Sequence, residues 1–175
     1  MSSGRRPQPG SPFAFHYRVV ERQRIRKILE QADVAMLVTT DPHDGQTARP
    51  MLPLWLPDDP HIYFLTHHSS QKLAHIAGEP CVALIIMRDR SYFVVHGAAH
   101  ASRDRELIRR LWHPSYRAWF PGGKDDREAA VLQVDIESVN YWEPPRSQFV
   151  RVFQAMKAIV TRRGIETPMK TIDGL

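Results

Sequence analysis

Residues 61–102 read HIYFLTHHSSQKLAHIAGEPCVALIIMRDRSYFVVHGAAHAS, and this stretch determines the architecture. Its apolar segments 61–66 and 81–87 flank a polar segment over 69–77, in which apolar residues recur at helical spacing. The pattern therefore predicts a strand, a short helix and a second strand. Segment 81–87 is apolar at nearly every position, which is typical of a strand buried on both faces. A tight turn then leads into a third strand over 92–102.

The rest of the chain also favours strands. Upstream, strands are predicted over 34–40 and 46–56, joined by a hairpin turn at 41–45. Downstream, strands are predicted over 129–135 and 138–142. Strands do not alternate with long helices, so the pattern favours an antiparallel barrel over a doubly wound sheet.

Further helices are expected around the barrel. The segment 17–32 has apolar residues every three to five positions, Asp104 is a typical N-cap for a helix over 105–112, and a last helix is predicted over 148–161. The predicted domain organisation is a flexible leader over 1–12, one folded domain over 13–165 and a C-terminal tail over 166–175.

Composition narrows the classes of function. The net charge is +5, but Lys and Arg alternate with acidic residues, as in 103–106, which argues against a nucleic-acid partner and leaves small anions as candidates. No apolar run reaches the ~20 residues that span a bilayer, and the leader has no apolar segment typical of a secretory signal, so we expect no membrane partner. Cys81 is the single cysteine, which excludes an internal disulfide and fits a reducing cytoplasm.

Several site classes have no matching motif. The sequence contains neither G-x-G-x-x-G nor G-x-x-x-x-G-K-S/T, and neither G-x-S-x-G nor H-E-x-x-H. His96 and His100 share one face of a predicted strand but would lie about 13 Å apart, too far to bind one ion. No metal site is therefore expected.

Two segments are candidates for binding an anion. Thr66, Ser70 and Lys72 lie where a predicted strand passes into a helix, a junction that exposes backbone N–H groups; the hydroxyls and the cation suit a phosphate monoester. Arg49 precedes Pro50, which removes a donor from the strand ladder and so predicts an edge or a bulge where backbone groups can contact a ligand. The alternative is that Arg49 simply points to solvent.

An aromatic segment follows the helix over 105–112. Trp112, Tyr116, Trp119 and Phe120 place four large rings within nine residues, which is unusual for a surface loop. They either form a wall for a flat aromatic ligand or fill the end of the barrel or a dimer seam.

In chain order, these segments resemble the FMN-binding split-barrel superfamily related to pyridoxamine 5'-phosphate oxidase, and within it the general stress protein group. The similarity runs from about residue 15 to residue 165. It rests on Arg49-Pro50-Met51, on Thr66-x-x-x-Ser70-x-Lys72, on His96-Gly97-Ala98-Ala99 with Asp104-Arg105, and on Leu111-Trp112 through Trp119-Phe120-Pro121 to Tyr141-Trp142. Gln71 departs from the family pattern, which usually has Pro before the lysine.

The resemblance implies a mainly β fold with peripheral helices, a six- to seven-stranded antiparallel split β-barrel of the FMN-binding type. It also implies a homodimer with two FMN sites at the subunit interface. The residues implied to bind FMN are Arg49, Ser70 and Lys72 at the phosphate, Pro50, Met51, Leu65 and Thr66 at the isoalloxazine, and Trp119 and Phe120 from the partner subunit.

The function that this similarity implies is an oxidoreductase, in which FMN transfers hydride between a reduced donor such as NAD(P)H and a small molecule. No catalytic residue is predicted; Tyr92 and His96 are candidates to orient a substrate, or else they line the barrel. The alternatives are a flavin-binding stress protein without significant turnover and a relative that binds haem or a deazaflavin. Genuine pyridoxamine 5'-phosphate oxidase activity is not expected, because the segment after Trp142 reads Glu-Pro-Pro-Arg-Ser-Gln and lacks the Arg-x-His substrate motif of that enzyme.

Overall fold

The computed structural model describes residues 12–41, 45–88, 90–143 and 169–174, with the side chains of the first helix from residue 21 onward. The predicted helix over 148–161 and most of the predicted leader lie outside the described residues.

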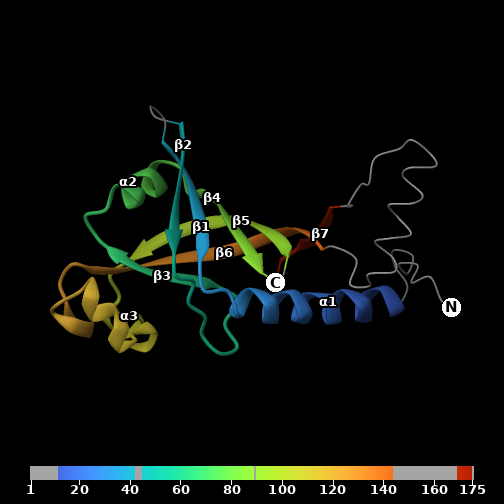
Figure 1. Cartoon of the computed structure of the whole chain (residues 1–175), viewed down its shortest axis with the longest axis horizontal. Helices are drawn as coiled ribbons and strands as arrows, with labels where there is room; N and C mark the ends of the chain where they lie inside the picture. The colour runs from blue at the N-terminus through green and yellow to red at the C-terminus, as the bar shows by residue number, and fades with distance from the viewer. Residues whose placement is uncertain (1–11, 42–44, 89, 144–168, 175) are drawn as a thin grey trace.

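The described chain consists of seven strands, three α-helices and two short 3-10 helices (Figure 1). In chain order they are α1 (Pro12–Glu30), β1 (Ala35–Asp41), β2 (Gly45–Met51), β3 (Ile62–His67), α2 (Gln71–Gly78), β4 (Cys81–Arg88), β5 (Ser91–Ser102), α3 (Arg105–Leu111), η1 (Pro114–Ala118), η2 (Gly123–Asp125), β6 (Ala129–Trp142) and β7 (Lys170–Asp173).

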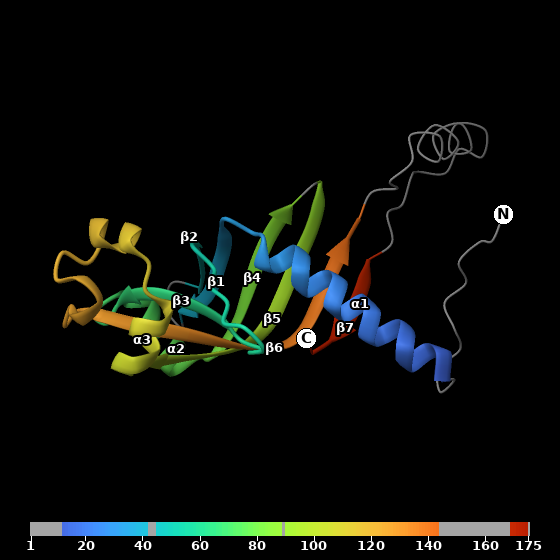
Figure 2. The ribbon, with the colours of Figure 1, turned by 90° about the horizontal axis from the view of Figure 1, so that it is seen from below.

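The strands form one antiparallel sheet in the order β2-β1-β4-β5-β6-β3, and β7 pairs with β6 beyond the end of β3. The sheet curls, but no ladder joins its edge strands β2 and β3 in the described residues. Leu54, in the segment after β2, forms an isolated bridge with Tyr63 of β3, in which the two exchange backbone hydrogen bonds of 2.8 and 2.9 Å. This arrangement is the predicted split barrel. Figure 2 shows α1 running across the strands from β4 to β7.

Two strand predictions differ from the structure. The predicted strand 46–56 ends as β2 at Met51, shortly before Pro53, which cannot donate to a ladder. The predicted strands 129–135 and 138–142 are one strand, β6. The alternation breaks there because Ile136 and Ser138 pair with consecutive residues of β5, which leaves Glu137 as the extra residue of a β-bulge.

The chain ends also differ from the prediction. Residues 170–173 fall within the predicted tail, yet they form β7 and pair with residues 138–141 of β6. The segment is short and mixed in polarity, so alternation alone did not indicate a strand. Helix α1 begins at Pro12, earlier than the predicted 17.

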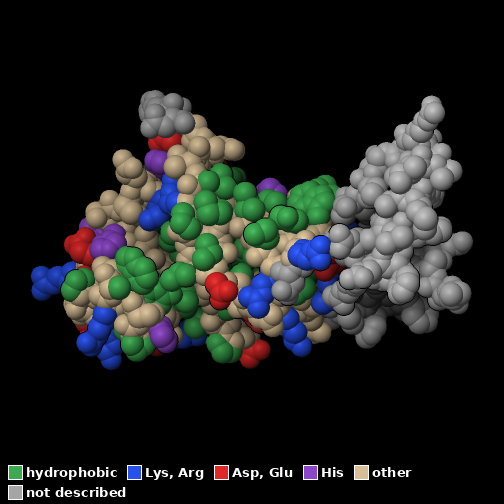
Figure 3. Space-filling view, viewed as in Figure 1, with side chains coloured by type: hydrophobic (Ala, Val, Ile, Leu, Met, Phe, Trp, Pro, Cys, Tyr) green, Lys and Arg blue, Asp and Glu red, His purple; other side chains and the backbone are tan. Residues whose placement is uncertain are grey.

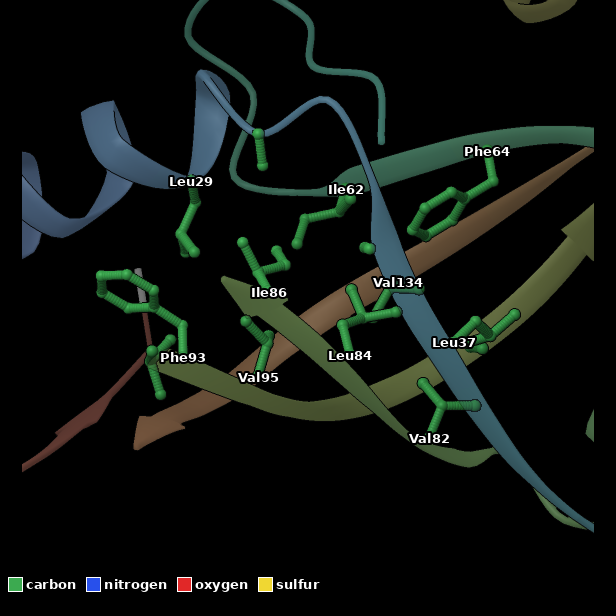
Figure 4. Close-up of a cluster of buried hydrophobic side chains, with 14 of the residues drawn as sticks. Leu29, Leu37, Ile62, Phe64, Val82, Leu84, Ile86, Phe93, Val95 and Val134 are labelled. Carbon is green, nitrogen blue, oxygen red and sulfur yellow. The ribbon is translucent and has the colours of Figure 1, made fainter. Parts of the chain in front are cut away.

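The hydrophobic core has two parts, one on each face of the β3–β6 pair. The main cluster fills the barrel beneath α1 and includes Leu29, Phe64, Leu84 and Phe93 (Figure 4). The second cluster lies on the outer face. There Ile108 and Leu111 of α3, Tyr116 of η1 and the nearby Phe120 cluster with Tyr63 of β3. The second cluster anchors the aromatic segment to the sheet.

Helix α1 is fastened to the sheet by a partly buried ionic network. Glu21 accepts hydrogen bonds from Arg24 at 3.0 Å and from the Tyr141 hydroxyl of β6, while Arg24 also donates to Glu143 at 2.7 Å. Burial alone would raise the pKa of Glu21, but the hydrogen bonds from Arg24 and Tyr141 outweigh it and hold this pKa below its ordinary value.

At the bulge, the close approach of β6 predicts that only glycine fits at position 97 of β5. A Cβ at this position would lie 2.1 Å from the carbonyl oxygen of Asp135, a backbone atom that cannot move aside without disturbing β6. We expect Gly97→Ala to lower the free energy of unfolding by about 1–3 kcal/mol or more. The measurement is urea denaturation against Gly78→Ala, where a Cβ meets no atom within 4 Å. Equal stability of the two variants would contradict the prediction.

Candidate functional site

The candidate site lies where the β1–β2 hairpin and the end of β3 meet the start of α2 (Figure 1). Each predicted phosphate-binding residue is found here: Arg49 on β2, and Ser70 and Lys72 at the start of α2. Thr66, near the end of β3, lies between them.

Arg49 is fixed by a buried hydroxyl of the neighbouring strand. Because Leu37 pairs with Arg49 and Thr39 with Thr47, Arg49 lies diagonally across from Thr39, within reach of a long side chain. Its Nη1 donates to Thr39 Oγ1 at 2.9 Å, and Thr39 is fully buried. Arg49 therefore points to the end of the barrel, not simply to solvent as in the alternative interpretation. Burial lowers its pKa from the ordinary value.

Lys72 is held in the same way by a second buried threonine. Its Nζ donates to Thr66 Oγ1 at 2.8 Å, and Thr66 is 4% exposed. Ser70 Oγ lies 3.4 Å from the same hydroxyl. Ser70 occupies the N-cap of α2 but makes no side-chain capping bond, which leaves its hydroxyl directed to this cluster.

The two cations repel each other, and neither forms an ion pair with a carboxylate in the described part of the chain. The pKa of Lys72 is lowered, first by burial and second by the positive charge of Arg49. Within the described residues no salt bridge joins Arg49 or Lys72 to an acidic side chain. Two positive charges held by neutral hydroxyls are electrostatically unfavourable alone and favourable around an anion. The arrangement is therefore suited to a phosphate group.

Three residues next to this pair, Thr39, Asp41 and His75, were not predicted from the sequence pattern. Thr39 Oγ1 lies 3.4 Å from His75 Nδ1 of α2, and His75 Nε2 lies 3.1 Å from an oxygen of Asp41. Thr39 shares the inward face of β1 with Ala35 and Leu37, so a polar residue at a core position was the signal available in the sequence.

The residues predicted to contact a ring lie on the same strands as the cations. Pro50 is exposed beside Arg49 on the edge strand β2, and Met51 is half-buried against the main core. Leu65 is half-buried and packs against the outer cluster. These positions adjoin the cation pair along the chain, but the two half-buried side chains also pack against different parts of the core.

The two residues of the aromatic segment that are predicted to bind the ligand, Trp119 and Phe120, differ in their exposure. Phe120 is buried and stacks on His67 at a centroid distance of 4.6 Å. Trp119 is 54% exposed and contacts Tyr116. Phe120 thus fixes the segment to the end of β3, while Trp119 presents its ring to the outside of the chain.

Tyr92 and His96 do not line the barrel. Both side chains are exposed on the outer face of β5, where Tyr92 pairs with Met87 of β4 and Val94 pairs with Ile85. We call Ile85, Met87 and Tyr92 the outer apolar face; their exposed fractions are 43, 67 and 51%. Figure 3 shows that hydrophobic side chains also gather over the middle of the face seen in that view.

The described part of the chain contains neither a cluster of metal ligands nor a membrane-spanning helix. Its His, Cys, Asp and Glu side chains form no group of three or more that could hold a metal ion. Its helices include none that is long and apolar enough to cross a membrane.

Comparison with known proteins relates this geometry to a family. Residues 21–166 match the model of the pyridoxamine 5'-phosphate oxidase-like family. No curated protein matches the sequence.

Solved structures with the same fold include several stress proteins. General stress protein 26 from Bacillus anthracis is 22% identical with a TM-score of 0.63, over 71% of this chain and 95% of that one. A Clostridium acetobutylicum protein related to general stress protein 26 is 18% identical with a TM-score of 0.61, over 69% and 87% of the two chains. The general stress FMN/FAD binding protein from Xanthomonas citri is 25% identical with a TM-score of 0.63, over 71% and 89%.

The cation pair predicts stabilisation by inorganic phosphate. At ten times its dissociation constant, phosphate adds about 1.4 kcal/mol to the free energy of unfolding, or about 3–6 °C in Tm for a chain of this size. Because phosphate requires protonated Lys72, whose pKa is lowered from the ordinary 10.5, the effect should weaken as pH rises through that lowered pKa.

Arg49→Met is expected to remove most of this stabilisation. The measurement is thermal unfolding in phosphate and in chloride at equal ionic strength, from pH 7 to pH 10. An equal Tm in both salts at pH 7 would show that the cations do not bind phosphate.

Proposed function

The chain belongs to the pyridoxamine 5'-phosphate oxidase-like family, and we propose that it is a flavin-binding protein that holds FMN by its phosphate at Arg49, Ser70 and Lys72. The observation that carries this proposal is the pair of like charges, Arg49 and Lys72, each held by a buried threonine hydroxyl and neither joined to a carboxylate among the described residues.

The residues present fit a phosphate monoester. The guanidinium of Arg49 has further N–H groups beside the one donated to Thr39, and the ammonium of Lys72 has two beside the one donated to Thr66. Ser70 adds a hydroxyl at the same end of α2. A doubly charged phosphate would offset the repulsion between Arg49 and Lys72, which contributes to the lowered pKa of Lys72. The cation pair therefore favours FMN over a flavin without a phosphate.

The isoalloxazine is proposed to lie along β2, which carries Arg49, and β3, which leads into the start of α2 with Ser70 and Lys72. Pro50 interrupts the donors of the edge strand β2, and Met51, Leu65 and Thr66 follow on the adjoining surface. The family resemblance adds Trp119 of a second subunit, and its exposed ring suits that role. Phe120 would act from beneath the surface, since it is buried against His67.

A homodimer is proposed to form through the outer apolar face. Ile85, Met87 and Tyr92 expose apolar area on neighbouring central strands, where a soluble monomer would ordinarily place polar residues. A second copy covering this face would bring Tyr92 and His96 into the interface, where they are proposed to orient a small substrate.

The proposed activity is hydride transfer between a reduced donor such as NAD(P)H and an unidentified small molecule. FMN held at Arg49, Ser70 and Lys72 would supply the redox chemistry of hydride transfer. The chain would bind the phosphate, orient the ring against β2 and β3, and exclude water where the second subunit covers the site. The Xanthomonas citri protein, named for FMN/FAD binding, supports the cofactor and leaves open the alternative of a flavin-binding protein without turnover.

Binding of FMN tests the cofactor. Addition of FMN followed by desalting should leave about one flavin per chain, read from visible absorbance. Arg49→Ala combined with Lys72→Ala should weaken FMN binding by roughly 3–6 kcal/mol, because hydrogen bonds to charged groups contribute roughly 1.5–3 kcal/mol each. Lys27→Ala with Arg110→Ala removes the same net charge from exposed helix positions and should leave the affinity unchanged.

Three outcomes separate the functional alternatives. Unchanged FMN affinity in the Arg49 and Lys72 double variant would remove the phosphate assignment. Steady NAD(P)H consumption would favour an enzyme, whereas one stoichiometric reduction would favour a binding protein. A sharp Soret band in the absorbance spectrum of the purified protein would show that the bound cofactor is haem and not FMN.

The dimer has its own test. Light scattering should give about twice the 20.2 kDa mass of the chain. Met87→Glu, which places a charge on the outer apolar face at its most exposed position, should give the single-chain mass and weaken FMN binding. Ala77→Glu, at an exposed position of α2, is the matched control. A wild-type protein with the mass of one chain would refute the shared site.

A further inference from the structure

His75 is linked to the cation pair through Thr39. It lies on α2 three residues after Lys72, and residues at this spacing share one face of a helix. That face is turned to β1 and β3, so the same helix supplies Lys72 to Thr66 and His75 to Thr39. Both side chains meet threonines that are almost fully buried.

The hydrogen-bonding groups assign a direction to this link. A carboxylate can only accept, so the contact of 3.1 Å with Asp41 places the imidazole proton on Nε2. In the neutral ring Nδ1 is then an acceptor, and it faces Thr39 Oγ1 at 3.4 Å. The Thr39 hydroxyl donates to Nδ1 and keeps its lone pairs for Arg49 Nη1, at 2.9 Å.

We propose that His75, with its tautomer fixed by Asp41, is a positioning residue of the anion site that orients the Thr39 hydroxyl and so holds Arg49 for the phosphate. The inference rests on the proposed function, in which Arg49 binds the phosphate of FMN. Thr39 is fully buried, so its hydroxyl has no water to replace a lost acceptor. Without Nδ1 the hydroxyl would turn its proton towards another acceptor, and the partner of Arg49 would lose its fixed orientation.

The test compares FMN with riboflavin, which has the same ring without the phosphate. Flavin fluorescence titrations give both dissociation constants for each variant. His75→Leu should weaken FMN about three- to tenfold, the range of one hydrogen bond, and leave riboflavin unchanged. His75→Asn places an amide oxygen near the position of Nδ1 and should recover most of the FMN affinity. A merely structural role would weaken both flavins together.

Two further variants make the test decisive. His100→Leu removes another histidine that contacts an aspartate, Asp135 at 3.4 Å, and should change neither constant. Thr39→Val removes the hydroxyl itself and should reproduce the FMN-selective loss, which covers the case that His75→Leu does not fold.

The outcomes distinguish this inference from the proposed function. If wild-type protein binds FMN no more tightly than riboflavin, the phosphate site and the positioning role both fail. If wild-type protein prefers FMN and both His75→Leu and Thr39→Val keep the full preference, the role of His75 alone is overturned.

Discussion

The pairing of β6 with three other strands is the constraint on which the rest of the fold depends. Along one side β6 pairs with β5, and along the other it pairs first with β3 and then with β7. The bulge at Glu137 reverses which residues point inward, so Leu132 and Val134 face the barrel before it and Val139 and Tyr141 after it. One strand can therefore support both the barrel and the network that fastens α1, while close contact at Gly97 preserves the register.

The cation pair Arg49 and Lys72 is held by a different kind of partner from the arginine of the α1 network. Arg24 is compensated by two carboxylates, whereas Arg49 and Lys72 are each held by a threonine hydroxyl. A hydroxyl fixes a cation in place without neutralising its charge, which keeps the electrostatic attraction for a ligand. Stability is thus given up locally at the end of the barrel, and the core and the α1 network offset this cost elsewhere.

Strand alternation predicted an antiparallel barrel, and the family resemblance specified a split barrel. The strand-to-helix junction placed Ser70 and Lys72 at the start of a helix, and alternation placed Arg49 on a strand, because both are local patterns. The sequence did not predict β7 or the continuity of β6, since a bulge interrupts alternation and a four-residue strand is recognisable only by its partner. Thr39 and His75 were not predicted as site residues, for a related reason. Their roles arise from contacts across β1, β2 and α2, which no spacing within one element reveals.

The order of strands gives the candidate site a kinetic property. Thr39 and Arg49 belong to the β1–β2 hairpin, and Thr66 and Lys72 belong to the adjoining β3–α2 unit, so each half can form locally. Only pairing of β3 with β6, far along the chain, completes the barrel that sets the halves side by side. Loop-closure entropy makes such distant pairing a late folding event. A bound anion would therefore act mainly on the rate of unfolding, prolonging the lifetime of the native state with little effect on how fast it forms.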